Sequence, residues 1–263
     1  MYYTKKALHE IEDSFTELTN RHIKLVEKLY LFTAILQNLQ AKEYFQHGVL
    51  RRLFLINKCI ENMFRIFPAD REEKLSEEEH YDVEINLHCF LINIFGIIEN
   101  IALSMAFENG IFANGASEKS NNIKISLLEI SLFKDKFRSM VSPKLKSYLD
   151  NSKISDWYKQ YAKNYRDALA HRIPPYVPPC GLNKEEHAEF MSLQNKITTL
   201  NPEEYSITIN KMHELGKAIP FYVHSFSEEA KKIYLHPQII ADFRTVEELL
   251  YVIINNFKLK ENE

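Results

Sequence analysis

Arg166, Asp167 and His171 are three side chains that could act together on a phosphate group. An arginine guanidinium is permanently charged and can hold two phosphoryl oxygens at once, whereas a histidine exchanges a proton near neutral pH. Positions 166 and 171 lie about 140° apart around an ideal helix, so the two side chains could flank a common cleft without stacking on each other. The spacing therefore suits phosphate chemistry assisted by proton transfer.

A structural interpretation of the same residues stays open. A histidine in the last turn of a helix is favourable in itself, because its cation complements the helix dipole. Arg166 and Asp167 could likewise be ordinary surface charges. Residue types and spacing alone do not decide between the two interpretations.

The segment that carries these residues is expected to be a helix from about Ser155 to Ile173. It ends there because Pro174 and Pro175 cannot continue a helix. A tyrosine stripe at helical spacing predicts either a core face or stacking surfaces for unpaired bases, and its members are Tyr158, Tyr161 and Tyr165.

Residues 166–171, with the sequence Arg-Asp-Ala-Leu-Ala-His, resemble the signature of the HEPN superfamily. In that signature an arginine, a polar residue and a histidine close a helix of a compact bundle. The following run, Arg-Ile-Pro-Pro-Tyr, resembles a branch of bacterial HEPN proteins. In that branch a long apolar helix, here 81–108, packs against the motif helix. The specific resemblance covers about residues 80–180.

The resemblance implies a metal-independent endoribonuclease with no cofactor, of the kind used as a toxin or defence effector. Arg166 would bind the scissile phosphate, His171 would act as general base or acid on the ribose 2′-hydroxyl, and Asp167 would orient them. HEPN sites are commonly shared across a two-fold dimer, so the resemblance implies a homodimer that acts on RNA, and it admits a cognate antitoxin as a further partner.

Four other residues are candidates for supporting roles. Glu99 and Asn100 interrupt an apolar helix and need polar partners, which the end of the motif helix or a loop could supply. Tyr165 and Arg172 adjoin the motif and could position the substrate. Two alternatives to catalysis stay open: a non-catalytic HEPN module that binds RNA or a protein partner, and a structural helical dimer.

Charge is consistent with an RNA partner. Between Leu132 and Arg172 there are ten basic and four acidic residues, a local balance of +6 in a chain whose net charge is −3. A basic stretch on an otherwise acidic chain is typical of a phosphate-backbone footprint.

The elements that must position the motif are predicted to be helices. Only 6 glycines occur in 263 residues, whereas an all-β chain needs a turn about every 8–12 residues. We expect an all-α bundle in one domain, with N-terminal helices over 1–68, a HEPN-like core over about 76–180 and a C-terminal extension over 181–263. In chain order, the expected elements are one or two helices over 4–39, helices over 47–67, 76–108, 184–200 and 202–215, a hairpin of 221–226 with 232–235, and a last helix from Thr245 to Lys258.

Composition points to a cytoplasmic protein. The three cysteines form no metal-binding or disulfide pattern, and the N-terminus lacks the apolar core of a signal peptide. The longest apolar run, 87–107, contains polar residues and is read as a buried core helix and not as a membrane span.

His80, Glu84 and His88 recur at four-residue spacing on one helix face, as metal ligands can. A di-iron bundle needs a second Glu-x-x-His motif and further glutamates, which the sequence lacks. We therefore expect no metal site.

Overall fold

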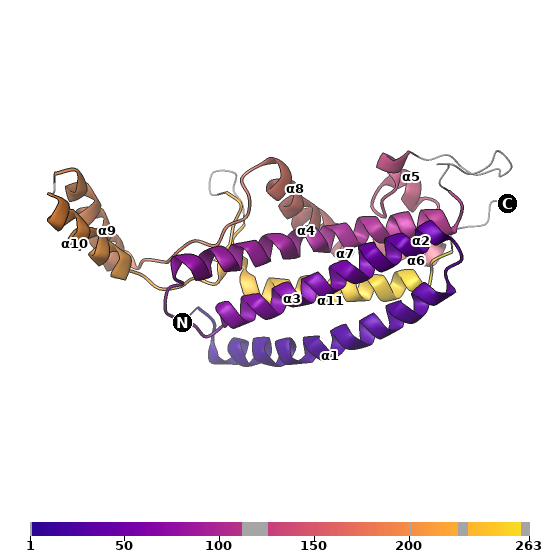
Figure 1. Cartoon of the computed structure of the whole chain (residues 1–263), viewed down its shortest axis with the longest axis horizontal. Helices are drawn as coiled ribbons and strands as arrows, with labels where there is room; N and C mark the ends of the chain where they lie inside the picture. The colour runs from indigo at the N-terminus through magenta and orange to yellow at the C-terminus, as the bar shows by residue number, and fades with distance from the viewer. Residues whose placement is uncertain (1, 112–125, 200, 226–230, 259–263) are drawn as a thin grey trace.

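The computed structural model describes residues 2–111, 126–199, 201–225 and 231–258. The fold is an all-α helical bundle, as predicted. Long helices lie roughly side by side in one elongated body, with α1 (Lys5–Ile35) along one side, α3 (Arg51–Ile66) and α4 (Glu77–Glu108) above it, and α11 (Leu235–Ile254) among them (Figure 1).

The N-terminal part is a single long helix. Thr4 caps α1 by accepting a hydrogen bond from the Ala7 amide, and the helix then continues without a break to Ile35. The second helical stretch begins earlier than its predicted start at 47, because Asn38 caps α2 (Leu39–Glu43) and the chain passes through a π-helical segment, η1 (Tyr44–Leu50), into α3.

Helix α4 has the bounds that the sequence predicts. Ser76 and Glu79 form a reciprocal capping box at its start. At its end Gly110 has φ 66°, a left-handed conformation that glycine adopts without steric cost. Burial of the apolar side chains along its length makes α4 the central helix of the core.

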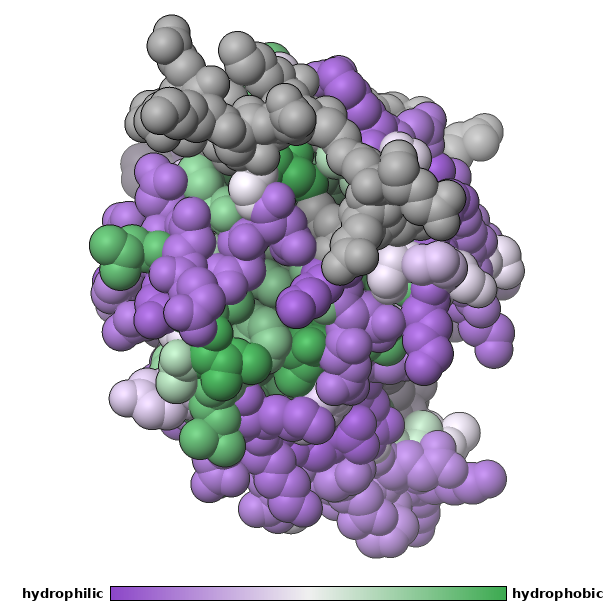
Figure 2. Space-filling model, turned by 90° about the vertical axis from the view of Figure 1, so that its right-hand side faces the viewer, coloured by the Kyte–Doolittle hydropathy of each residue, from purple (hydrophilic) through white to green (hydrophobic). Residues whose placement is uncertain are grey.

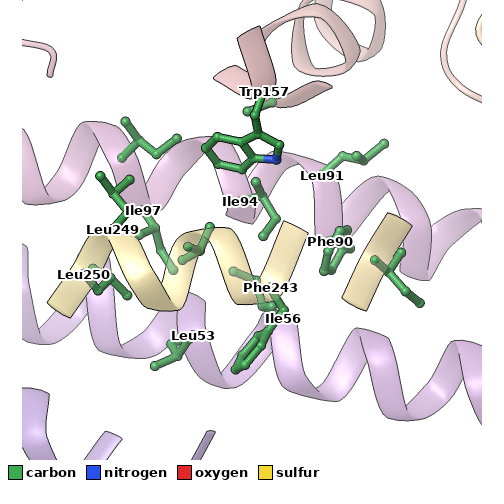
Figure 3. Packing of buried hydrophobic residues seen from close by; sticks show 14 of the residues in the cluster. Leu53, Ile56, Phe90, Leu91, Ile94, Ile97, Trp157, Phe243, Leu249 and Leu250 are labelled. Atoms are coloured by element: carbon green, nitrogen blue, oxygen red, sulfur yellow. The ribbon is translucent and has the colours of Figure 1, made fainter. Parts of the chain in front are cut away.

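Helix α11 begins ten residues before the predicted start at Thr245, so that prediction was wrong. Pro237 lies in the first turn, where a proline costs no backbone hydrogen bond. Thr245 instead donates to the Ala241 carbonyl in mid-helix. Phe243, Leu249 and Leu250 are fully buried, and Figure 3 shows them beside residues of α3 and α4. The last helix is thus part of the bundle core.

The motif lies on a second layer of short helices, which packs against α4 on the side away from α1 (Figure 1). Short elements lead into it, namely η2 (Leu127–Glu129), α5 (Asp135–Arg138) and α6 (Pro143–Leu149). A continuous helical stretch then runs through α7 (Ser152–Trp157), a π-helical segment η3 (Tyr158–Lys163) and α8 (Asn164–His171). Trp157 points from α7 into the core (Figure 3), and its indole donates a 2.7 Å hydrogen bond to Asp242 of α11.

After α8 the chain forms a small β element and a protruding arm. The predicted hairpin is present but shorter than expected, as β1 (Phe221–Tyr222) paired with β2 (Ile233–Tyr234); position 226 of the prediction lies outside the described residues. The arm consists of α9 (Lys184–Lys196), η4 (Ile197–Thr199) and α10 (Pro202–Glu214), which bury none of their described residues and extend away from the bundle (Figure 1). The bridge between Gly181 and Lys217 closes its base.

Within the described residues, α4 is the one helix long and apolar enough to cross a membrane. Of its most apolar window, 67% is buried inside the bundle. Such burial is compatible with a soluble protein whose central helix is apolar on all sides.

Candidate functional site

The predicted motif lies at the end of a helix. Helix α8 ends at His171, two residues before the predicted end, and Arg172 adopts an extended conformation. The π-helical segment η3 ends at Lys163, three residues before Arg166. Such π-helical segments are rare in proteins but occur frequently at functional sites.

Arg166 is held between an aromatic ring and a carboxylate. Its guanidinium carbon lies 4.0 Å from the centroid of the Phe95 ring of α4, a cation–π geometry. One Nη atom lies 3.2 Å from the Asp167 carboxylate, which Lys163 also contacts. The side chain is only 25% exposed, and its buried Nε has no hydrogen-bond partner among the described residues. Arg166 is therefore held in place, with a quarter of its side chain exposed.

Glu99 lies in the electrostatic surroundings of Arg166. Its carboxylate accepts a 2.8 Å hydrogen bond from the Ser131 hydroxyl, so it fixes the loop before α5. Burial raises the pKa of Glu99, and the positive charges of Lys134 and Arg166 partly oppose that effect. Glu99 thus holds the loop through a hydrogen bond and interacts with the charge of Arg166.

The tyrosine stripe belongs mainly to the core. Tyr158 is 8% exposed and stacks on Phe133 with ring centroids 3.8 Å apart. Burial raises the pKa of Tyr158 to about 12. Tyr165 is 3% exposed and contacts Tyr222 and His224 edge-on. Tyr165 therefore supports the helix from inside the bundle and has no surface to offer a substrate.

His171 and Arg172 stand at the exposed end of α8. Arg172 donates to the backbone and side-chain oxygens of Asn164, at 3.1 and 2.7 Å, and so braces the helix end. No hydrogen bond or ion pair of His171 is found among the residues that the structure describes, and none joins it to Arg166. The imidazole is accordingly accessible to an incoming group.

The histidine stripe of α4 clamps the segment that follows the motif. His80 contacts the Val177 carbonyl and His88 the Pro175 carbonyl, each through Nε2 at 2.5 Å. Glu84 accepts a 3.0 Å hydrogen bond from the Val177 amide. Because these three side chains bind backbone groups of residues 175–177, the stripe has a structural role: it fixes where the chain leaves α8. Across the described ranges, no group of three or more histidine, cysteine, aspartate or glutamate side chains is arranged to hold a metal ion.

Local ion pairs neutralise part of the basic stretch. Lys136 pairs with Glu129, Arg138 with Asp135 and Asp150, and Lys146 with Asp150. Lys144, Lys153 and Lys159 are exposed, and within the described part of the chain no ion pair involves them. Fewer unpaired positive charges are thus exposed along this stretch than the count of basic residues in the sequence indicates.

Asn100 is engaged by a residue that the sequence analysis did not single out. Its side-chain oxygen accepts a 2.8 Å hydrogen bond from Nε of Arg52 on α3 and not from the motif helix. One signal could have identified Arg52: Val49, Arg52 and Ile56 recur at helical spacing, which places an arginine in an apolar stripe.

No family model matches the chain, and no match is found among curated proteins or solved structures.

Proposed function

We propose that this chain is a metal-independent endoribonuclease of the HEPN type, with Arg166, Asp167 and His171 as its catalytic residues. A single observation carries the proposal: the last two turns of one helix hold an arginine that is immobilised yet partly exposed and a histidine that is exposed. An immobilised cation and an accessible proton acceptor are the two groups that in-line attack on a phosphodiester requires.

In the proposed reaction the ribose 2′-oxygen attacks the adjacent phosphorus. The new bond from the 2′-oxygen to phosphorus forms as the bond from phosphorus to the 5′-oxygen breaks, leaving a cyclic phosphate and a 5′-hydroxyl. His171 takes the proton from the 2′-hydroxyl, and the leaving oxygen receives one from solvent or from a second histidine. Arg166 stabilises the charge that develops on the non-bridging oxygens. DNA lacks the 2′-hydroxyl and is not a substrate.

Asp167 and Phe95 would prepare Arg166 for this role. The ring face and the carboxylate fix the guanidinium before RNA binds, so little conformational entropy is lost on binding. A homodimer is part of the proposal, because an isologous contact at the exposed end of α8 would bring a second His171 to each site. Toxicity of the free enzyme in cells would support a role in defence. It would also support the existence of a cognate antitoxin that neutralises the enzyme.

The test is cleavage of a mixed cellular RNA pool in EDTA. We expect the wild type to cut RNA, and Arg166→Ala and His171→Ala to lose at least about a hundredfold in rate, the usual size of a general acid–base contribution. Arg65→Ala and His187→Ala are matched controls at exposed positions away from the motif and should cut like the wild type. An inert wild type that still binds RNA would identify a binding module instead.

A further inference from the structure

A second arginine, Arg52, lines a cavity of about 530 Å³. The cavity lies among α2, η1, the start of α3 and the second half of α4, near the end of the bundle at the right of Figure 1. Its volume is within the range of small-molecule sites. Figure 2 faces this end of the bundle and shows hydrophilic side chains around a more apolar centre.

Two asparagines hold the guanidinium of Arg52 in place. Nε donates to Asn100 and Nη1 donates to Asn93, both at 2.8 Å. Arginine has five N–H donors, and the other three make no hydrogen bond to the described residues. The partners are neutral amides, so they orient the cation without cancelling its charge.

The charge of Arg52 is also without a counter-ion among the described residues. No described carboxylate forms an ion pair with it, and burial lowers the pKa of Arg52 below its ordinary value. A partly buried cation without a counter-ion is costly, and that cost is relieved when an anion binds.

The backbone is shaped to admit this network. An added Cβ at Gly96 would lie 2.5 Å from the guanidinium carbon of Arg52, and one at Gly48 would lie 2.7 Å from the side-chain carbonyl carbon of Asn100. Two glycines thus stand where any larger residue would displace the arginine or its partner. Gly48 lies within the π-helical segment η1. The other arginine considered above, Arg166, likewise lies next to a π-helical segment, η3.

Phe107 and Leu127 make part of the lining apolar, and the remaining polar side chains suit a phosphate group. Gln40, Tyr44 and His47 add neutral or cationic donors, and Arg51 contacts His47 at 3.3 Å. Among the described lining residues Glu43 carries the single carboxylate, and its side chain is exposed. The site therefore has a fixed cation, Arg52, which would attract an anion. It also has one acidic group, Glu43, which would weaken anion binding.

We propose that the Arg52 cavity binds a phosphate group, either as the free ion or as the phosphate of a nucleotide-sized molecule. Arg52 would contact the phosphate with the donors that Asn93 and Asn100 leave available, and His47 and Gln40 would add hydrogen bonds from the side. The described residues that line the cavity include none of the proposed catalytic residues, so this proposal does not rest on the proposed function.

The test is calorimetric titration of the full chain carrying Arg166→Gln, so that the proposed cleavage site does not contribute. The probes are inorganic phosphate, adenosine 5′-monophosphate and adenosine. We expect phosphate and the monophosphate to bind and adenosine to bind at least about tenfold more weakly, since it lacks the charged group that Arg52 would hold by hydrogen bonds. A monophosphate that binds more tightly than phosphate identifies a nucleotide as ligand, and equal affinity identifies the phosphate group alone.

Variants assign the binding to the cavity. Arg52→Gln should weaken phosphate binding at least about tenfold, whereas Arg65→Gln, an exposed arginine on the same helix, should leave it unchanged. Glu43→Gln should tighten binding severalfold, because it removes the acidic group, and His47→Asp should weaken it. These last two side chains are exposed and outside the buried network, so the test holds even if Arg52→Gln does not fold. Unchanged affinity in Arg52→Gln or in both exposed variants, equal binding of adenosine, or no binding of phosphate and monophosphate would overturn the proposal.

Discussion

The guanidinium of Arg166 lies over the face of the Phe95 ring, 4.0 Å from its centroid. This contact joins the motif helix to the central helix α4. Phe95 is spaced from Glu99 by one helical turn, so the same face of α4 places an aromatic ring and a carboxylate near the arginine. Helix α4 thus positions the motif as well as filling the core.

Replacing Phe95 should therefore impair the site more than the fold. Phe95→Leu keeps an apolar side chain but removes the ring face, a loss of about 1 kcal/mol for a cation–π contact. We expect RNA cleavage to slow about five- to tenfold at equal folded concentration. Phe54→Leu, at a phenylalanine that is 53% exposed on α3, is the matched control. Equal rates for both variants would show that the ring does not position Arg166.

Two buried groups should oppose each other in the dependence of stability on pH. Burial raises the pKa of Asp242 to about 6 from 3.8 and lowers the pKa of His236 to about 4 from 6.5. The stabilisation from Asp242 is full below pH 3.8 and is lost as the pH rises through about 6. That from His236 is full above pH 6.5 and is lost as the pH falls through about 4. Between about pH 4 and pH 6 the two trends in stability therefore offset each other.

Single variants should separate the two trends. A difference of about two between the folded and unfolded pKa corresponds to about 3 kcal/mol. Relative to the wild type, Asp242→Asn should lose stability more steeply as the pH falls from 6 to 4, and His236→Gln should gain it. Urea unfolding at a series of pH values measures both slopes, and parallel curves for all three proteins would contradict the assignment.

The clamp on residues 175–177 can be tested by amide exchange. In Glu84→Ala the Val177 amide loses its 3.0 Å hydrogen bond and should exchange about fivefold faster, since one hydrogen bond contributes about 1 kcal/mol. Asp82→Ala changes an exposed carboxylate on the same helix and serves as control. If Val177 exchanges alike in both variants, the clamp contributes nothing to local stability.

Gly96 and Arg52 should show a coupled effect on stability. In the wild type, Gly96→Ala forces a methyl group to within 2.5 Å of the guanidinium, and we expect a loss of about 1 kcal/mol in the free energy of unfolding. In an Arg52→Ala background the clash is absent, and the same change should add about 1 kcal/mol through helix propensity. Denaturant unfolding of the wild type, Gly96→Ala, Arg52→Ala and the double variant gives a double-mutant cycle. If Gly96→Ala changes the free energy of unfolding with the same sign in both backgrounds, the contact is refuted.

The helical elements were largely predictable because their signals are local. The Ser76 cap and the Gly110 stop define α4, and the proline pair limits α8. The start of α11 was misplaced because Thr245 has the residue type of a helix cap while Pro237 has that of a helix breaker, although a proline in the first turn is compatible with a helix.

The partners of polar side chains were not predictable from the sequence. Pairing of Asn100 with Arg52 depends on how α3 and α4 align across their interface, and no local pattern encodes that alignment. The stripe of His80, Glu84 and His88 has the spacing of metal ligands and of a backbone clamp alike. Only the path of the chain after α8 distinguishes the two.

The most direct test of the proposed function is the chemistry of the cut ends. After a cleavage site has been mapped in the RNA pool, two oligonucleotides are compared in EDTA, one all-ribose and one with a single 2′-deoxy residue on the 5′ side of the scissile phosphate. We predict that the wild type cuts the first to a cyclic phosphate and a 5′-hydroxyl and leaves the second intact, and that His171→Ala cuts neither. Cleavage of the deoxy substrate, or undiminished cutting by His171→Ala, would contradict the assignment.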